Sequence, residues 1–330
     1  MSKLLYLLPF LLLLLLLNLP LVAEGEGFTI IDSDTIRDQG GRQIDVQEPF
    51  SRIISLYGAH TENLYALGAG GQVVGVSRSM TYPPRARENP GFSYHQGVER
   101  FLAVDPDLIL VRPMIDEGYP QLISRLEQAG IKVVSLQPRT PEEITTYWRI
   151  LGLLSGRQDR AERLIDEFER KMDQMRELGP SAEERKTVYF ESIHDQMKTF
   201  APKSIAMHVL ETAGGRNAAS DARSVRDTNI AEFSRERILD RGEEIDVYLT
   251  QKGPMNQPTK EMIRNSPGFS QVKAVREDRV HIIEEYIVSR PTPRLLLGTY
   301  RIGRILYPDS FTSEKEDSIQ ELIHGLYNKE

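Results

Sequence analysis

The feature that most constrains this chain is a long amphipathic stretch near its middle, residues 158–178. Apolar side chains recur there every three or four positions and charged side chains fill the other faces, which is the pattern of an α-helix with one buried stripe. Gly179 and Pro180 end the pattern. At the rise of an α-helix the stretch is about 30 Å long. The apolar stripe consists of Ala161, Leu164, Ile165, Phe168, Met172, Met175 and Leu178.

Strand-like segments alternate with helical patterns on both sides of this helix. Such alternation indicates parallel sheets with helices on their faces. We therefore predict an α/β protein of two Rossmann-like lobes with mainly parallel sheets, joined by a single long helix that acts as a strut. The predicted parts are an N-terminal lobe at 24–155, the connecting helix at 156–180 and a C-terminal lobe at 181–330. The strand-like segments are 52–58, 72–77, 108–113 and 131–137 before the helix, and 186–193, 245–251 and 279–285 after it, while 27–33 and 41–46 read as an outer hairpin.

The first residues have the pattern of a secretory signal peptide. Lys3 is followed by a leucine-rich run from Leu4 to Val22, and Ala23 precedes an abrupt change to polar residues. We predict a signal peptide at 1–23 and a periplasmic location, with a retained membrane anchor as the alternative because the run is close to the roughly 20 residues that span a bilayer. The chain has no cysteine, from which we predict that it is not a lipoprotein.

Composition narrows the classes of partner and of activity. The formal net charge is −7 and no basic cluster follows the leader, which argues against a nucleic-acid partner. The catalytic motifs G-x-S-x-G and H-E-x-x-H and a Walker-type loop are missing from the sequence. We therefore expect a monomeric binding protein without a catalytic cofactor, and not an enzyme.

Several stretches, in order, resemble one family. They are RIISLYGAHTENLYALGAGGQVVGVS, TYPP at 81–84, GVERFLAVDPDLILV, AGG at 213–215, SRERI at 234–238 and SRPTPRLLLG at 289–298. The chain is similar to the periplasmic substrate-binding proteins of ABC importers for iron–siderophore complexes, haem and cobalamin. The resemblance implies a ligand held between the lobes, and as partners an inner-membrane permease dimer with its cytoplasmic ATPase.

The resemblance also implies one docking glutamate on each lobe. The matching positions are Glu99 in GVERF and Glu236 in SRERI. A carboxylate–guanidinium pair with a permease arginine is directional and speeds encounter. The alternative is that both are solvated helix charges or pair locally with Arg100, Arg235 and Arg237.

Candidate ligand contacts lie at or just after the predicted strand ends. Aromatic rings give a flat ligand large contact area, and arginine binds carboxylates or phosphates through two hydrogen bonds. Imidazole can also ligate iron or cobalt, so His60, His95 and His194 are candidate metal ligands, with a helix-cap role as the alternative for His60. The predicted contacts are Tyr57, His60, Tyr82, Tyr94, His95, His194, Phe200, Arg226 and Arg290.

The sequence ranks the transported ligands without deciding between them. Arginines at the strand ends favour an anionic iron complex, either a siderophore or haem, and we rank it first. A corrinoid ranks second because TYPP and SRERI are equally similar to cobalamin carriers. Molybdate or another metal chelate, an exported sensor and an exported enzyme on the same scaffold remain less favoured alternatives.

Overall fold

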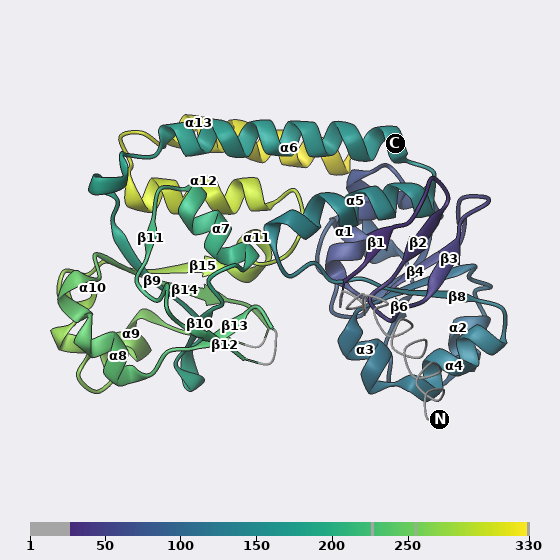
Figure 1. Cartoon of the computed structure of the whole chain (residues 1–330), viewed down its shortest axis with the longest axis horizontal. Coiled ribbons are helices and arrows are strands. Elements are labelled where there is room, and N and C mark those ends of the chain that lie inside the picture. The colour runs from purple at the N-terminus through teal and green to yellow at the C-terminus, as the bar shows by residue number, and fades with distance from the viewer. Residues whose placement is uncertain (1–26, 226–227, 255, 329–330) are drawn as a thin grey trace, which may run out of the picture.

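The computed structural model describes residues 27–225, 228–254 and 256–328. Figure 1 shows two α/β lobes side by side, with one long helix, α6 (Gln158–Leu178), running along one edge of both. The predicted fold class is confirmed, and α6 has the bounds that the apolar pattern predicts. The residue boundaries of the lobes themselves stay a prediction.

The N-terminal lobe is built on a parallel sheet of order β6-β5-β4-β7-β8. The middle strands are buried at every position, as expected for strands covered on both faces. The strands are β4 (Ile53–Ser55), β5 (Val73–Ser77), β6 (Gly91–Phe92), β7 (Leu108–Val111) and β8 (Lys132–Ser135), and the helices are α1 (Gly58–Ala66), α2 (Val98–Leu102), α3 (Pro113–Gly118), α4 (Pro120–Gln128) and α5 (Pro141–Ser155).

A small antiparallel sheet precedes this lobe where we predicted a two-stranded hairpin. It has the order β1-β2-β3, with β1 (Thr29–Ile30), β2 (Thr35–Arg37) and β3 (Gln43–Asp45). The predicted first strand is broken because the Asp32 side chain accepts hydrogen bonds from the backbone N–H groups of Asp34 and Thr35. Such an Asx turn favours a reversal of the chain over a continuous strand.

The C-terminal lobe contains a mixed sheet of order β12-β13-β10-β9-β14-β15, with β11 also paired to β9. Strands β9, β11, β14 and β15 are parallel, whereas β10, β12 and β13 add antiparallel pairs at one side. The strands are β9 (Thr187–Ile193), β10 (Lys198–Phe200), β11 (Arg216–Asn217), β12 (Arg223–Ser224), β13 (Ile230–Glu232), β14 (Val247–Lys252) and β15 (Val280–Glu284). The helices are α7 (Ile205–Thr212), α8 (Arg235–Asp240), α9 (Lys260–Arg264), α10 (Lys273–Arg276), α11 (Glu285–Val288), α12 (Leu295–Leu306) and α13 (Ser313–Tyr327).

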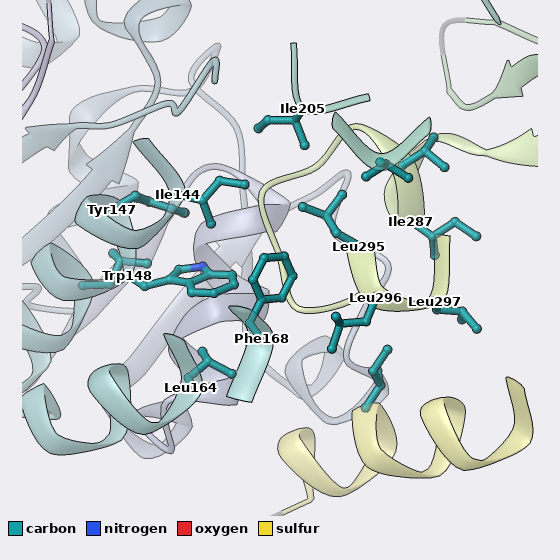
Figure 2. Close-up of a cluster of buried hydrophobic side chains, with 14 of the residues drawn as sticks. Ile144, Tyr147, Trp148, Leu164, Phe168, Ile205, Ile287, Leu295, Leu296 and Leu297 are labelled. Atoms are coloured by element: carbon teal, nitrogen blue, oxygen red, sulfur yellow. The ribbon is translucent and has the colours of Figure 1, made fainter. Parts of the chain in front are cut away.

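Helix α6 holds the lobes through its buried stripe. It packs antiparallel to α5 after a turn at Gly156, whose φ of 66° favours glycine. Phe168 of α6 meets Trp148 of α5 edge to face, with ring centroids 5.0 Å apart. Figure 2 shows these rings beside Leu295 and Leu296 of α12. One continuous hydrophobic core therefore passes from the first lobe to the second.

A second helix, α13, also connects the lobes, and this bridging role was not predicted from the sequence. Helix α13 begins against α12, where buried Glu316 binds Arg301 and Arg304 through hydrogen bonds of 2.8 and 2.7 Å. It ends against α1, where buried Tyr327 meets Tyr82 edge to face at 4.8 Å. Figure 1 shows α13 running behind α6. Two roughly parallel struts resist relative rotation of the lobes better than one.

The described part of the chain holds no helix with the length and apolar character that crossing a membrane requires.

Candidate functional site

The strand order of the N-terminal lobe places two side chains at a topological switch point. Strand β4 connects through α1 to β5 on one side, while β7 lies on its other side. Open α/β sheets bind ligands outside the carboxyl ends of the strands at such a point. Tyr57 follows β4 and Arg112 follows β7, so these two residues flank it.

Tyr57 and Arg112 are in direct contact. The guanidinium carbon of Arg112 lies 4.7 Å from the centroid of the Tyr57 ring, within cation–π range. Burial raises the pKa of Tyr57, although the Arg112 and Arg290 guanidiniums oppose the rise. The phenol is therefore neutral and can donate a hydrogen bond from its hydroxyl. The buried Nε of Arg112 has no hydrogen-bond partner among the described residues. The pair offers a cation and a hydroxyl donor.

The C-terminal lobe brings Arg290 to the same place. Its Nη1 is so close to the backbone of Gly58 that a Cβ there would lie 3.0 Å from it. Arg290 is restrained by two carboxylates, with Nε 3.5 Å from Glu285 and Nη1 3.9 Å from Glu62. The guanidinium thus reaches the start of α1 from the opposite lobe.

Behind Arg290, a buried ion pair fixes the junction of the lobes. Arg294 donates from Nε and Nη2 to the two oxygens of Glu62, each at 2.8 Å. The guanidinium carbon of Arg294 lies 4.4 Å from the ring centroids of both Tyr82 and Tyr286. Asn63 also donates to the Pro291 carbonyl at 2.8 Å. This network sets the position of the 289–294 loop.

A second aromatic group follows β6. Tyr94, His95 and Tyr119 form three mutual ring contacts with centroids 4.5 to 5.2 Å apart, and the Tyr119 hydroxyl lies 3.2 Å from His95 Nδ1. Because the strands are parallel, this cluster lies at the same end of the sheet as Tyr57. The exposed His95 and half-buried Tyr94 remain predicted ligand contacts.

In the C-terminal lobe, His194 follows β9 and lies at the corresponding end of that sheet. Its Nδ1 is 3.1 Å from both oxygens of the fully buried Glu191. The hydrogen bond with Glu191 raises the pKa of His194, while burial opposes it. His194 also remains a predicted ligand contact.

The structure contradicts the predicted roles of two residues, His60 and Phe200. His60 is completely buried, with Nδ1 2.6 Å from the Tyr147 hydroxyl and Nε2 3.0 Å from the Val111 carbonyl, so it neither faces a ligand nor caps its helix. Phe200 is completely buried against Phe190. Tyr82 is half-buried and packs on Arg294 and Tyr327 at the junction, and its role as a ligand contact stays a prediction.

The structure does not bring the three candidate metal ligands His60, His95 and His194 together into one site. Each imidazole is engaged in a different place, on Tyr147, Tyr119 and Glu191 respectively. Within the residues that the structure describes, no cluster of three or more His, Cys, Asp or Glu side chains is arranged to hold a metal ion. Arg226, the remaining predicted contact, lies outside the described residues.

Glu99 and Glu236 occupy matching positions in the two lobes. Each is exposed, and each is the second residue of a short helix, α2 or α8. Both carboxylates fold toward the helix start. A Cβ on Gly97 would lie 2.5 Å from Glu99 Oε2, and the Ser234 hydroxyl lowers the pKa of Glu236. Helices α2 and α8 both lie on the side of the molecule away from α6 (Figure 1).

Sequence reasoning missed Arg112, Glu62, Glu191 and Tyr119 at this site. Arg112 carried a usable signal, since it directly follows the strand LILV and precedes Pro113 at a strand-to-helix junction. Glu62 and Glu191 had no such signal, because their burial depends on partners far away in the sequence. Two α/β lobes held by helical struts, with Arg290 of one lobe brought to Tyr57 and Arg112 of the other, have the architecture of a two-lobed binding protein.

Comparison with known proteins identifies the family. The sequence model described as "Periplasmic binding protein" matches residues 53–286, and the chain belongs to that family. The uncharacterized ABC transporter substrate-binding lipoprotein YvrC of Bacillus subtilis is 26% identical over 283 residues, covering 84% of this chain and 86% of YvrC. The vitamin B12-binding protein of Pectobacterium carotovorum is 28% identical over 260 residues, covering 76% and 86%.

A solved structure agrees with this assignment. A possible iron-binding periplasmic solute-binding protein from Staphylococcus epidermidis superposes with a TM-score of 0.69 and 26% identity, covering 79% of this chain and all of that one. The similarity extends over both lobes, so the family match rests on the architecture as well as on the sequence.

The comparison also corrects the predicted location. We predicted a periplasmic protein with a signal peptide that is not a lipoprotein. The relative YvrC is a lipoprotein, which contradicts the exclusion of lipid attachment, so the absence of cysteine was too weak a basis for it. The predicted signal peptide at 1–23 lies outside the described residues.

Proposed function

We propose that this protein is the solute-binding component of an ABC importer and captures an iron complex, of the siderophore or haem type, between its lobes. The observation that carries the proposal is the approach of Arg112 and Arg290 to Tyr57 from opposite lobes. Two guanidiniums at a sheet switch point suit a ligand with carboxylate or catecholate oxygens.

The surrounding rings extend this recognition to a large flat or rounded ligand. The Tyr94–His95–Tyr119 cluster lies at the same end of the first sheet as Tyr57, and His194 lies at the matching end of the second. Aromatic side chains provide contact area with little loss of conformational entropy. The two struts hold both sides in place, which lowers the ordering cost of binding.

A corrinoid is the second candidate ligand. The observation in its favour is the relative from Pectobacterium carotovorum, a vitamin B12-binding protein that aligns with 76% of this chain. The iron complex keeps the first rank because two guanidiniums favour an anionic ligand, and because the structural neighbour from Staphylococcus epidermidis is described as a possible iron-binding protein.

Delivery requires docking on a permease dimer, whose ATPase lies in the cytoplasm. The proposed docking carboxylates are Glu99 and Glu236, and their exposure, one on each lobe on the side opposite the struts, supports this role. A monomer presents both carboxylates at once to a dimeric partner. The ligand is cargo, and the protein carries out no reaction on it.

The experiment that tests this function is co-elution. The purified protein is incubated with haemin, cyanocobalamin or a ferric catecholate siderophore, passed through a gel-filtration column and scanned in the visible range. Stoichiometric retention of haemin or the siderophore supports the iron-complex function, and retention of cyanocobalamin alone supports the corrinoid. If no chromophore elutes with the protein, the metal-chelate function is wrong.

Two further measurements separate the other functions. Recovery of chemically unchanged ligand after release excludes an enzyme, and a permease complex that depends on Glu99 and Glu236 distinguishes an importer component from a sensor.

A further inference from the structure

The C-terminal lobe contains a buried carboxylate near the end of β9 that has no role in the proposed function as described above. Glu191 is completely buried. It accepts hydrogen bonds from the Tyr248 hydroxyl at 2.8 Å and the Thr250 hydroxyl at 2.9 Å, both on β14. His194 Nδ1 lies 3.1 Å from each of its oxygens. Glu191 thus receives three donors at once.

The protonation state of this group follows from its partners. A carboxylate that accepts from three donors is acting only as an acceptor, which is the behaviour of the ionised form. A fully buried negative charge is costly unless a cation compensates it. Among the hydrogen-bond partners that the structure describes for Glu191, only His194 can carry a positive charge. The geometry therefore assigns a carboxylate–imidazolium pair.

The backbone of His194 is also fixed in place at the end of β9, and its side chain is 8% exposed. Its backbone N–H donates to Asn256 Oδ1 at 3.1 Å, and Asn256 Nδ2 donates in turn to the carbonyls of Ser192 and Gln251 at 3.1 and 2.7 Å. The Ser289 hydroxyl donates to Gln251 Oε1 at 3.2 Å, which connects this loop with the one that carries Arg290. His194 Nε2 has no hydrogen bond to any described residue.

We propose that His194, held as an imidazolium by Glu191, donates a hydrogen bond from Nε2 to an anionic group of the ligand. The C-terminal lobe then contributes two cations, His194 and Arg290, opposite Arg112 of the other lobe. This inference rests on the proposed function and narrows its substrate class to complexes with at least two separated anionic groups, such as the two propionates of haem.

The groups that face the pair determine how it responds to pH. On β9 and β14 they are Tyr189 and Tyr248, whose phenols burial keeps neutral by raising the pKa of each. On the turn that follows β9 the charged neighbour is Asp195, which favours the imidazolium. Affinity for an anionic ligand is therefore complete while His194 is protonated and is lost as the pH rises through its raised pKa.

The first test needs no ligand. The imidazole of His194 is titrated by NMR, with its resonance assigned by comparison with His194→Gln and the exposed His324 as the internal reference. The pair predicts a pKa for His194 above that of His324, and a lower one in Glu191→Gln. A His194 pKa at or below that of His324 in the wild-type protein overturns the ion pair, whether or not Glu191→Gln folds.

The second test uses haemin as the probe at pH 6 and pH 8.5. We expect the haemin affinity of the wild-type protein to fall about tenfold between these two pH values, which corresponds to the loss of one charge-assisted hydrogen bond. The affinity of His194→Gln should change less over the same range. His324→Gln on α13 is the matched control and keeps the wild-type profile. Parallel profiles for wild type and His194→Gln overturn the ligand contact alone. If haemin does not bind at any pH, both the haem-type function and the proposed contact between His194 and the ligand are wrong. The NMR titration then still shows whether His194 and Glu191 form an ion pair.

Discussion

Glu62 and Arg294 lie 232 positions apart in the sequence and form two hydrogen bonds of 2.8 Å across the junction of the lobes. The Glu62 side chain is completely buried and the Arg294 side chain is 8% exposed. Arg294 is the last residue of the 289–294 loop that carries Arg290. The pair therefore connects the stability of the junction with the position of Arg290, a proposed ligand contact.

Substitution of Glu62 by Gln should destabilise the protein strongly. It leaves the Arg294 guanidinium buried without its counter-charge, which costs about 3–5 kcal/mol in unfolding free energy. The matched control is Glu162→Gln, which breaks the exposed pair with Arg149 and should cost less than about 1 kcal/mol. Urea unfolding measures both, and similar losses in the two variants would contradict a special role for the buried pair.

Removal of the Tyr327 ring should loosen the second strut. Tyr327 is 3% exposed and packs on Tyr82 at 4.8 Å, so Tyr327→Ala should lower the unfolding free energy by about 3–5 kcal/mol. Tyr327→Phe is the control, because the hydroxyl has no hydrogen-bond partner among the described residues, and its effect should stay below about 1 kcal/mol. Equal stability of the Ala and Phe variants would show that α13 does not brace the lobes.

Acid should act on the fold through His60. Burial lowers the pKa of His60 to about 3, whereas the unfolded chain binds a proton near pH 6.5. The unfolded state therefore holds the extra proton between these values, and stability falls as the pH decreases from 6.5, by up to about 1.4 kcal/mol per pH unit from this group.

His60→Gln tests this linkage, because the variant cannot titrate. Its unfolding free energy, lower than that of the wild type at pH 7, should approach the wild-type value as the pH falls toward 4. His194 contributes with the opposite sign, since its raised pKa gives stability that is lost as the pH rises, but it is present in both proteins. A constant difference between the two stability curves would contradict a neutral, buried His60.

Loss of either docking carboxylate should weaken the permease complex without changing ligand affinity. Glu99→Gln and Glu236→Gln each remove one charge-assisted hydrogen bond, and we expect roughly a tenfold loss of affinity for the permease in proteoliposomes from each. Glu183→Gln, at an exposed position outside α2 and α8, is the control. If both variants bind the permease as tightly as Glu183→Gln does, the proposed docking surface is wrong.

The architecture was largely predictable, because strand–helix alternation and the stripe of α6 are local patterns with a fixed period. The site was less predictable. His60 and Phe200 follow or end strands, as ligand contacts do, but the sequence does not show that Tyr147 and Phe190 cover them. Glu62, Glu191 and the second strut depend on contacts between distant residues, which no local periodicity records. Arg112 was accessible from its place at the end of a strand and was overlooked.

The most direct measurement of the central claim is hydrogen–deuterium exchange with and without the chromophore that co-elutes. Binding between the lobes predicts slower exchange on both sides at once, in peptides that cover 56–60 and 111–114 of the first lobe and 192–196 and 285–290 of the second. Protection confined to one lobe, or to the hollow of about 650 Å³ that α6, α12 and α13 form on the strut side, would contradict the account.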